Sequence, residues 1–213
     1  MSVRIHILSS SPALKRYEPR LRKISQSAVK RIERFLSLKN IDIVLYDNPD
    51  DTIPEVGGIG GYTPNAHTVL ISLNPHHPKF SQAIDRELSA TLAHEIHHAI
   101  RWRNPGYGTT LLEALITEGL ADHFSIEVGS VTKPPPWSRA LNDKEIPKLL
   151  KRAKPLFNRS YNHADWFFGS KKNRLPRWTG YSLGYYLVGK YLKTHPQKKP
   201  SKLVSVKATM ILE

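Results

Sequence analysis

The chain of 213 residues contains no cysteine. This absence excludes disulfide bridges, thiolate zinc sites, iron–sulfur clusters and cysteine nucleophiles. No apolar stretch approaches the roughly 20 residues that a membrane-spanning helix needs. The N-terminal segment also lacks the uninterrupted apolar core of a secretory signal. We therefore expect a protein without a membrane span that resides in the cytoplasm.

Acidic residues are scarce compared with basic ones. The chain has 18 Asp and Glu against 32 Lys and Arg, which gives a net charge of +14 and a pI near 10.0. Such a surplus attracts polyanions, including nucleic acid. However, the basic concentrations at 15–34 and 190–207 each contain a single aromatic residue, Tyr17 and Tyr191, and so lack the series of interleaved aromatic residues that stack on bases. A solvated basic surface is the simpler interpretation, so nucleic acid is an allowed partner that the sequence does not favour.

The remaining composition, with 39% hydrophobic and 23% charged residues, is typical of a folded globular protein. Alternation and helical periodicity predict the regular elements. The strands are expected over 3–8, 41–46 and 68–73, and the helices over 17–38, 78–103, 111–128, 146–153 and 180–194. The glycine-rich approach to the third strand is predicted to be a loop, and residues 159–177 are predicted to be irregular.

This order of elements predicts an α+β fold in which a small sheet is followed by a mainly helical half. We expect a single domain over residues 1–195. Its sheet-containing half runs to about residue 80 and its helical half covers 81–195, followed by a basic C-terminal tail over 196–213.

The segment TLAHEIHHAI contains an H-E-x-x-H motif within a predicted helix. His94 and His98 are four residues apart, so both imidazoles lie on one helical face and can reach the same metal ion. Glu95 is rotated by about 100° from His94, so its carboxylate can lie beside a metal-bound water instead of binding the metal. His97 is off this face, and we do not expect it to be a ligand.

A catalytic zinc ion needs a third protein ligand and an open fourth position. The next predicted helix offers Glu113 and Glu118, but Thr110 and Glu113 fit a capping box at its start. Glu118 is therefore the expected third ligand, and the following Gly119 would let another backbone or the metal site come close. Asp122 lies one turn further on and could accept a hydrogen bond from the outer nitrogen of a ligating histidine.

The motif HEIHH, separated by 19 residues from Glu118, with Asp122 four residues further on, resembles the metal-site pattern of thermolysin-like zinc peptidases, the gluzincins. The segments AHEIHHAIRW, ITEGLADHF and RWTGYSLGYYLV are similar to a bacterial family of predicted zinc-dependent proteases, over roughly residues 60–195. The resemblance implies a zincin-like metallopeptidase domain, with the sheet packed on the metal-binding helix, that carries one Zn²⁺ per chain.

The chemistry expected at such a site is hydrolysis of a peptide or protein substrate. Zinc would activate water, and Glu95 would act as the general base. A donor must also stabilise the tetrahedral intermediate. Tyr181 is the preferred candidate and Tyr185 the second, with His163 and Arg177 as weaker ones. Either tyrosine could instead be an aromatic residue that packs in the core.

Gly60, Gly61 and Tyr62 lie shortly before the metal-binding helix, where an exposed strand could pair with a peptide backbone. The same glycines would also fit a plain hairpin loop. His123 and the pair His76-His77 are not expected to bind metal.

Two other functions compete with a peptidase that acts on free peptides. One is a DNA-associated zinc protease similar to the SprT-like proteins, recruited by the basic surface. That group usually takes its third ligand from histidine and often carries a cysteine-rich zinc ribbon, and neither feature is present. The other is a non-catalytic zinc-binding protein. A structural zinc would need a fourth protein ligand, and the sequence offers no convincing one.

Overall fold

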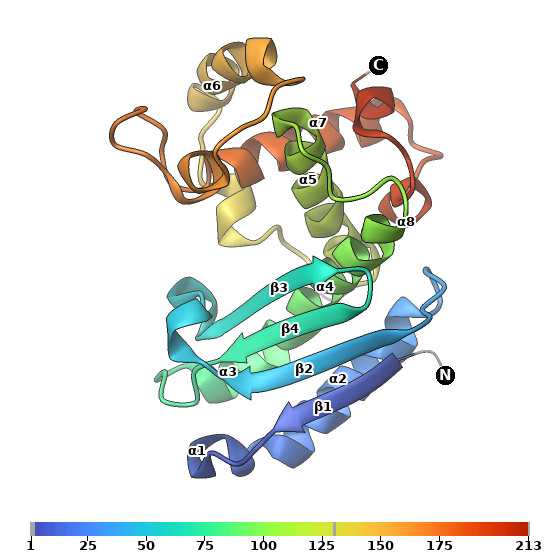
Figure 1. Cartoon of the computed structure of the whole chain (residues 1–213), viewed down its shortest axis with the longest axis vertical. Helices are drawn as coiled ribbons and strands as arrows, with labels where there is room; N and C mark the ends of the chain where they lie inside the picture. The colour runs from blue at the N-terminus through green and yellow to red at the C-terminus, as the bar shows by residue number, and fades with distance from the viewer. Residues whose placement is uncertain (1–2, 130, 213) are drawn as a thin grey trace. The chain divides into compact units, whose positions relative to one another are not determined.

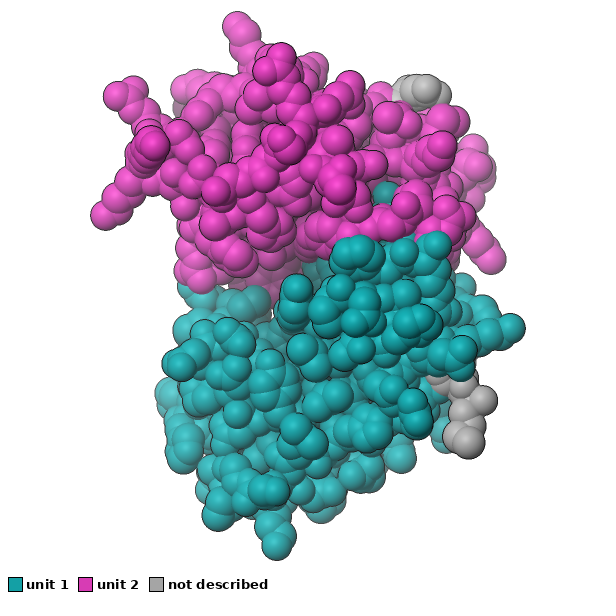
Figure 2. Space-filling view, in the orientation of Figure 1, with its two compact units in different colours: residues 1–103, 125–132 teal, residues 104–124, 133–213 magenta. Residues whose placement is uncertain are grey.

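A computed structural model of the chain describes residues 3–129 and 131–212 and has a mixed α+β fold. The chain forms two compact units, which Figure 2 shows in different colours. Unit 1 comprises residues 1–103 and 125–132, and unit 2 comprises residues 104–124 and 133–213. The first unit thus extends past the expected end of the sheet-containing half and includes the H-E-x-x-H helix.

Unit 1 contains a four-stranded sheet with the order β1-β2-β4-β3. Strands β1 (Val3–Leu8), β2 (Ile41–Asp47) and β4 (Thr68–Leu73) are mutually parallel, and β3 (Ile59–Asn65) pairs antiparallel with β4 at the edge. The three predicted strands are confirmed. The predicted loop is wrong from Ile59 onward, because pairing with β4 makes this glycine-rich segment a strand despite its lack of hydrophobic alternation.

Helices cover one face of this sheet, as Figure 1 shows for α2, α3 and α4. The helices of unit 1 are α1 (Pro12–Lys15), α2 (Glu18–Ile32), α3 (Phe80–Arg86) and α4 (Leu88–Arg103), with short 3₁₀ turns η1 (Pro49–Asp51) and η2 (Pro54–Val56). Ile43, Leu45 and Ile71 of the sheet are fully buried. The single helix predicted over 78–103 is divided at Glu87, and α2 ends six residues before the predicted boundary.

Unit 2 is helical. Its elements are α5 (Leu111–Glu127, up to Phe124), η3 (Pro136–Arg139), α6 (Glu145–Ala153), η4 (Lys154–Leu156), the π-helical turn η5 (Ala164–Phe168), α7 (Thr179–Thr194), α8 (Pro200–Leu203) and η6 (Ala208–Ile211). Leu203, Ala208 and Ile211 are buried in the same core cluster as Leu115 and Leu183. The residues after 196 therefore contribute to the core of this unit.

The predicted capping box begins α5. The main-chain N–H of Thr110 donates to the Glu113 carboxylate at 3.0 Å, and the Thr110 hydroxyl donates to it at 2.8 Å. These bonds satisfy donors that the first helical turn would otherwise expose. Among residues 3–129 and 131–212, no helix combines the length and apolar character that crossing a bilayer requires.

Helices α5 and α7 cross at two glycines. A Cβ atom added to Gly119 would lie 2.3 Å from the main-chain oxygen of Gly184, and one added to Gly184 would lie 2.0 Å from that of Leu115. Only glycine permits backbones to approach so closely. The expectation that Gly119 allows the approach of another backbone is confirmed, and that backbone belongs to α7.

Candidate metal centre

Two histidines of α4 converge within unit 1. His94 and His98 are both buried, their Nε2 atoms are 2.9 Å apart, and their rings meet edge to face at 87°. The spacing of four residues places them on consecutive turns of one helical face. Two imidazole nitrogens directed at one point form half of a tetrahedral zinc site.

Glu95 lies beside this pair and is also buried. The hydroxyl of Thr63, in strand β3, donates to Oε2 of Glu95 at 2.7 Å and lies 3.0 Å from the main-chain oxygen of the same residue. Strand β3 is further held to α4 by Trp102, whose indole N–H donates to the Thr63 carbonyl at 2.9 Å. The edge strand β3 therefore fixes the position of the Glu95 carboxylate.

Gly61 makes room for the same carboxylate. A Cβ atom at this position would lie 2.6 Å from Cγ and 2.6 Å from Oε1 of Glu95. Such a distance is well below van der Waals contact, so a side chain here would displace the glutamate. The structure thus gives Gly61 a packing role beside Glu95, and its contact with substrate stays a prediction. The neighbouring Tyr62 is exposed on the edge strand.

Glu118 lies on α5, in unit 2, and is buried. The phenol of Tyr107 donates a hydrogen bond to its Oε1. Burial and the adjacent Glu118 carboxylate raise the pKa of Tyr107 well above its ordinary value, so this phenol stays protonated as a donor. The hydroxyl of Thr117 in turn donates to the Tyr107 carbonyl at 3.1 Å, which fixes the loop that carries this tyrosine.

Two further tyrosines of unit 2 interact electrostatically with Glu118 or with its partner Tyr107. Burial, followed by the charges of Glu118 and Glu113, raises the pKa of Tyr161 to about 12. Tyr181, at the start of α7, also acts electrostatically on Tyr107 and packs edge to face on Phe167 at 4.9 Å. Phenols that remain protonated at neutral pH can donate hydrogen bonds to a developing negative charge.

Tyr185 lies one turn beyond Tyr181 and has a different neighbourhood. Its ring stacks on the imidazole of His123 at 4.0 Å, and the His123 Nε2–H donates to the Tyr185 carbonyl at 3.0 Å. Burial lowers the pKa of His123, whereas burial and the charge of Asp122 raise that of Tyr185. His123 is thus a neutral stacking partner of Tyr185 in unit 2.

Asp122 is fully buried and accepts hydrogen bonds from two residues of its own unit. The indole N–H of Trp137 donates to Oδ1 at 3.1 Å, and the hydroxyl of Ser138 donates to Oδ2. The hydroxyl of Ser182 also donates to the Trp137 carbonyl at 2.7 Å, so η3 is attached to α7 as well. The predicted hydrogen bond from a histidine to Asp122 stays a prediction.

The weaker oxyanion candidates occupy separate places in unit 2. His163 stacks on Phe167 at 4.4 Å, and its Nδ1 lies 3.2 Å from the phenol oxygen of Tyr161. Arg177 places its guanidinium over the ring of Trp178 at 3.9 Å. Of the two, His163 is thus the one in contact with a tyrosine near Glu118.

Sequence reasoning missed three residues of these surroundings. Thr63, Tyr107 and Tyr161 belong to no motif, and each lies in an edge strand, a loop or an irregular segment. The proximity of Thr63 to the glycine pair was the only available signal. For the other two, the sequence carried none, since their contacts arise from tertiary packing.

The candidate ligands are thus His94 and His98 in unit 1 and Glu118 in unit 2, all buried. Two imidazoles and one carboxylate form a ligand set that is common in catalytic zinc sites. A family model described as "Predicted Zn-dependent protease (DUF2268)" matches residues 21–213. This match confirms the family resemblance and extends it toward the N-terminus. No curated protein and no solved structure matches the chain.

Proposed function

Since the chain belongs to the family of predicted Zn-dependent proteases, we propose that it is a single-zinc peptidase of the gluzincin type, in a zincin-like fold. His94, His98 and Glu118 hold the ion in this proposal. The observation that carries it is the convergence of the two buried imidazoles, with Nε2 atoms 2.9 Å apart, beside a carboxylate that is held separately by Thr63.

The donor set fits zinc. Histidine nitrogens and a carboxylate oxygen are usual zinc ligands, and three protein ligands leave one position for water or substrate. When bound, zinc lowers the pKa of water toward neutrality and polarises a substrate carbonyl. Glu118 already accepts a hydrogen bond from Tyr107, and such support usually orients a metal-binding carboxylate. In the proposal, Asp122 supports an outer imidazole nitrogen in the same way.

Glu95 is the proposed general base. Its carboxylate takes a proton from the attacking water and later delivers it to the leaving amine. The hydrogen bond from Thr63 and the space left by Gly61 hold that carboxylate in one orientation before substrate arrives. Holding a catalytic group in its reactive orientation lowers the entropic part of the activation barrier.

The proposed donors to the tetrahedral intermediate are tyrosines of unit 2. Tyr181 is favoured over Tyr185, because Tyr181 shares the surroundings of Tyr107 and Glu118, whereas Tyr185 stacks on His123. Tyr161 joins Tyr181 as a candidate for the same reason. We further propose that Gly60, Gly61 and Tyr62 contact the substrate backbone, since β3 is an edge strand.

The experiment that tests this function combines metal analysis with a cleavage profile. Wild-type protein should contain about one zinc ion per chain and should cut members of a diverse peptide library. Glu95→Gln should retain zinc and lose cleavage by several orders of magnitude, whereas His98→Ala should lose the zinc. A Glu95→Gln variant with wild-type activity would exclude Glu95 as base. Zinc-loaded protein without any cleavage would favour the non-catalytic alternative.

A further inference from the structure

The positive charge of the chain is concentrated in unit 2. This unit has 18 Lys and Arg against 7 Asp and Glu, a net charge of +11, whereas unit 1 has 14 against 11, a net charge of +3. Part of the surplus lies between 144 and 177, outside the two basic concentrations evident from the sequence. Unit 2 also carries Glu118 and the tyrosines near it, so most of the charge accompanies the carboxylate half of the proposed site.

A loop over residues 168–178 presents several of these cations. Ser170 and Leu175 form an antiparallel bridge with mutual 2.9 Å hydrogen bonds, which closes the tight turn 171–174. Arg152 of α6 supports the turn, because its guanidinium donates to the carbonyls of Asn173 at 2.8 Å and Arg174 at 3.0 Å. Lys171, Lys172, Arg174 and Arg177 are exposed on this supported loop.

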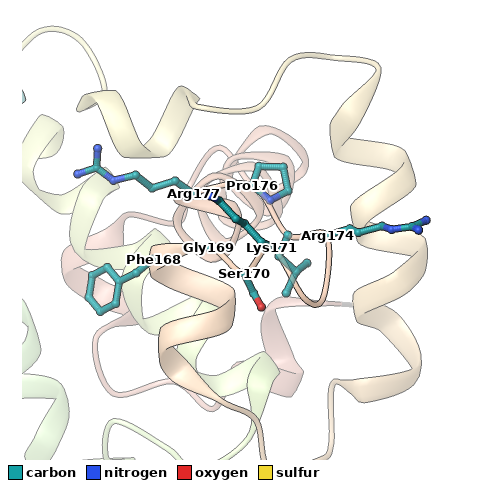
Figure 3. A pocket seen from close by; sticks show the side chains of 8 residues that line it. Phe168, Gly169, Ser170, Lys171, Arg174, Pro176 and Arg177 are labelled. Atoms are coloured by element: carbon teal, nitrogen blue, oxygen red, sulfur yellow. The ribbon is translucent and has the colours of Figure 1, made fainter.

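The loop borders a surface hollow of about 470 Å³. Figure 3 shows the side chains of Arg174 and Arg177 extending to opposite sides of it, with Phe168 on the Arg177 side. Phe168 is 60% exposed. The hollow thus combines cations on two sides with an apolar ring, and an extended anionic chain could contact both arginines at once.

Aromatic contacts within unit 2 connect this loop to the surroundings of Glu118. Phe168 lies 5.8 Å from His163, and His163 contacts the phenol of Tyr161. Phe167 packs on both His163 and Tyr181. The loop is therefore attached, through adjacent rings, to the tyrosines proposed to face the reacting bond.

We propose that the loop over residues 168–178 is a substrate subsite that selects acidic polypeptides, with Arg174 and Arg177 binding carboxylate side chains of the substrate. This inference rests on the proposed peptidase function and names its substrate class. Several like charges around a concave surface raise the local concentration of an oppositely charged chain. Arginine forks also bind carboxylates through two parallel hydrogen bonds.

A polypeptide fits this surface better than a nucleic acid. Within residues 168–178 the ring of Trp178 is covered by Arg177, so Phe168 is the aromatic side chain that is mainly exposed. Sequence-independent binding of single strands uses aromatic residues on which successive bases stack. Two separated arginines and one ring match carboxylates and an apolar residue of a peptide more closely.

The test uses a quenched peptide that the enzyme cleaves, resynthesised with Glu, Gln or Lys at the positions that flank the cut. Wild-type protein should show a kcat/KM for the Glu peptide about tenfold or more above that for the Lys peptide, and this ratio should shrink when NaCl rises from about 50 mM to about 500 mM. The double variant Arg174→Glu/Arg177→Glu should bring the ratio to one or below.

Lys198→Glu/Lys199→Glu is the matched control, because it changes the net charge of unit 2 equally at two exposed positions outside the loop. It should keep the wild-type ratio. If the charge reversal impairs folding, Arg174→Gln/Arg177→Gln takes its place, and polyglutamate should inhibit wild-type protein more strongly than this variant. A ratio near one in wild-type protein, or an unchanged ratio in the loop variants, would overturn the proposal.

The experiment distinguishes a failure of the acidic-substrate proposal from a failure of the proposed peptidase function. Cleavage of the Gln peptide that Glu95→Gln abolishes would support the peptidase whatever the charge preference. Anisotropy with a labelled single-stranded oligonucleotide provides the last comparison. Tight binding that the loop variant loses, together with equal cleavage of the Glu and Lys peptides, would assign the loop to nucleic acid and overturn the acidic-substrate proposal.

Discussion

The hydroxyl of Thr63 lies 2.7 Å from the carboxylate of Glu95, and these two residues are 32 positions apart in the chain. One belongs to the edge strand β3 and the other to the helix α4, so this contact attaches the sheet to the proposed general base. A substrate that pairs with β3 would therefore lie against the same strand that orients the base. Binding and proton transfer would share one rigid element.

Thr63→Val should lower kcat/KM by about ten- to a hundredfold, the usual cost of removing a residue that orients a reacting group. Valine keeps the shape of threonine but cannot donate to Glu95. Zinc content should be unchanged, and Thr63→Ser, which keeps the hydroxyl, should stay within a few-fold of wild type. If valine and serine variants had the same activity, the hydrogen bond would have no role in orienting the base.

Gly61→Ala should reduce kcat/KM by about a hundredfold, because its methyl group would push the Glu95 carboxylate aside and small misplacements cost that much. A double-mutant cycle on the free energy of unfolding isolates the clash. Gly61→Ala should destabilise wild-type protein clearly more than it destabilises the Glu95→Ala variant, which lacks the clashing carboxylate. If Gly61→Ala destabilised wild-type protein and the Glu95→Ala variant equally, the added methyl group would clash with a residue other than Glu95.

Tyr107→Phe should weaken zinc binding by about ten- to a hundredfold, because it removes the hydrogen bond that orients Glu118. Zinc affinity is measured by competition with a chromogenic chelator. Tyr186→Phe on α7 is the control, since Tyr186 is 40% exposed, and it should bind zinc like wild type. Unchanged affinity in Tyr107→Phe would show that Glu118 needs no such support.

Burial lowers the pKa of His123 below the ordinary value of 6.5. The unfolded chain therefore takes up this proton at a higher pH than the folded one, so stability is greatest above pH 6.5 and declines as the pH falls toward the folded-state pKa. In metal-free protein, His123→Gln should reduce the loss of unfolding free energy between about pH 7.5 and about pH 5.5. His76→Gln, at an exposed position, should leave that loss unchanged.

The local parts of the candidate centre were predictable because helix geometry fixes them. A spacing of four residues suffices to bring His94 and His98 together, and the capping box of Thr110 and Glu113 is evident from their spacing of three residues. Three short segments were also enough to identify the family from the sequence, and the family match confirms that identification.

The remaining parts depend on contacts between distant segments. Strand β3 lacks the alternation that would have identified it, and its pairing with β4 supplies the hydrogen bonds that make it a strand. Thr63 gains its role only from that pairing. Tyr107 and Tyr161 come from a loop and an irregular segment, where no periodicity indicates which way a side chain points.

The glycine crossing of α5 and α7 restricts how Glu118 can move. Gly119 follows Glu118 directly, and its backbone touches that of Gly184, between the turns that carry Tyr181 and Tyr185. Two helices in such intimate contact cannot slide or roll past each other without a collision of main-chain atoms. The carboxylate and the tyrosines of α7 must consequently move as a single body, so any rearrangement of this part of the protein would carry them together.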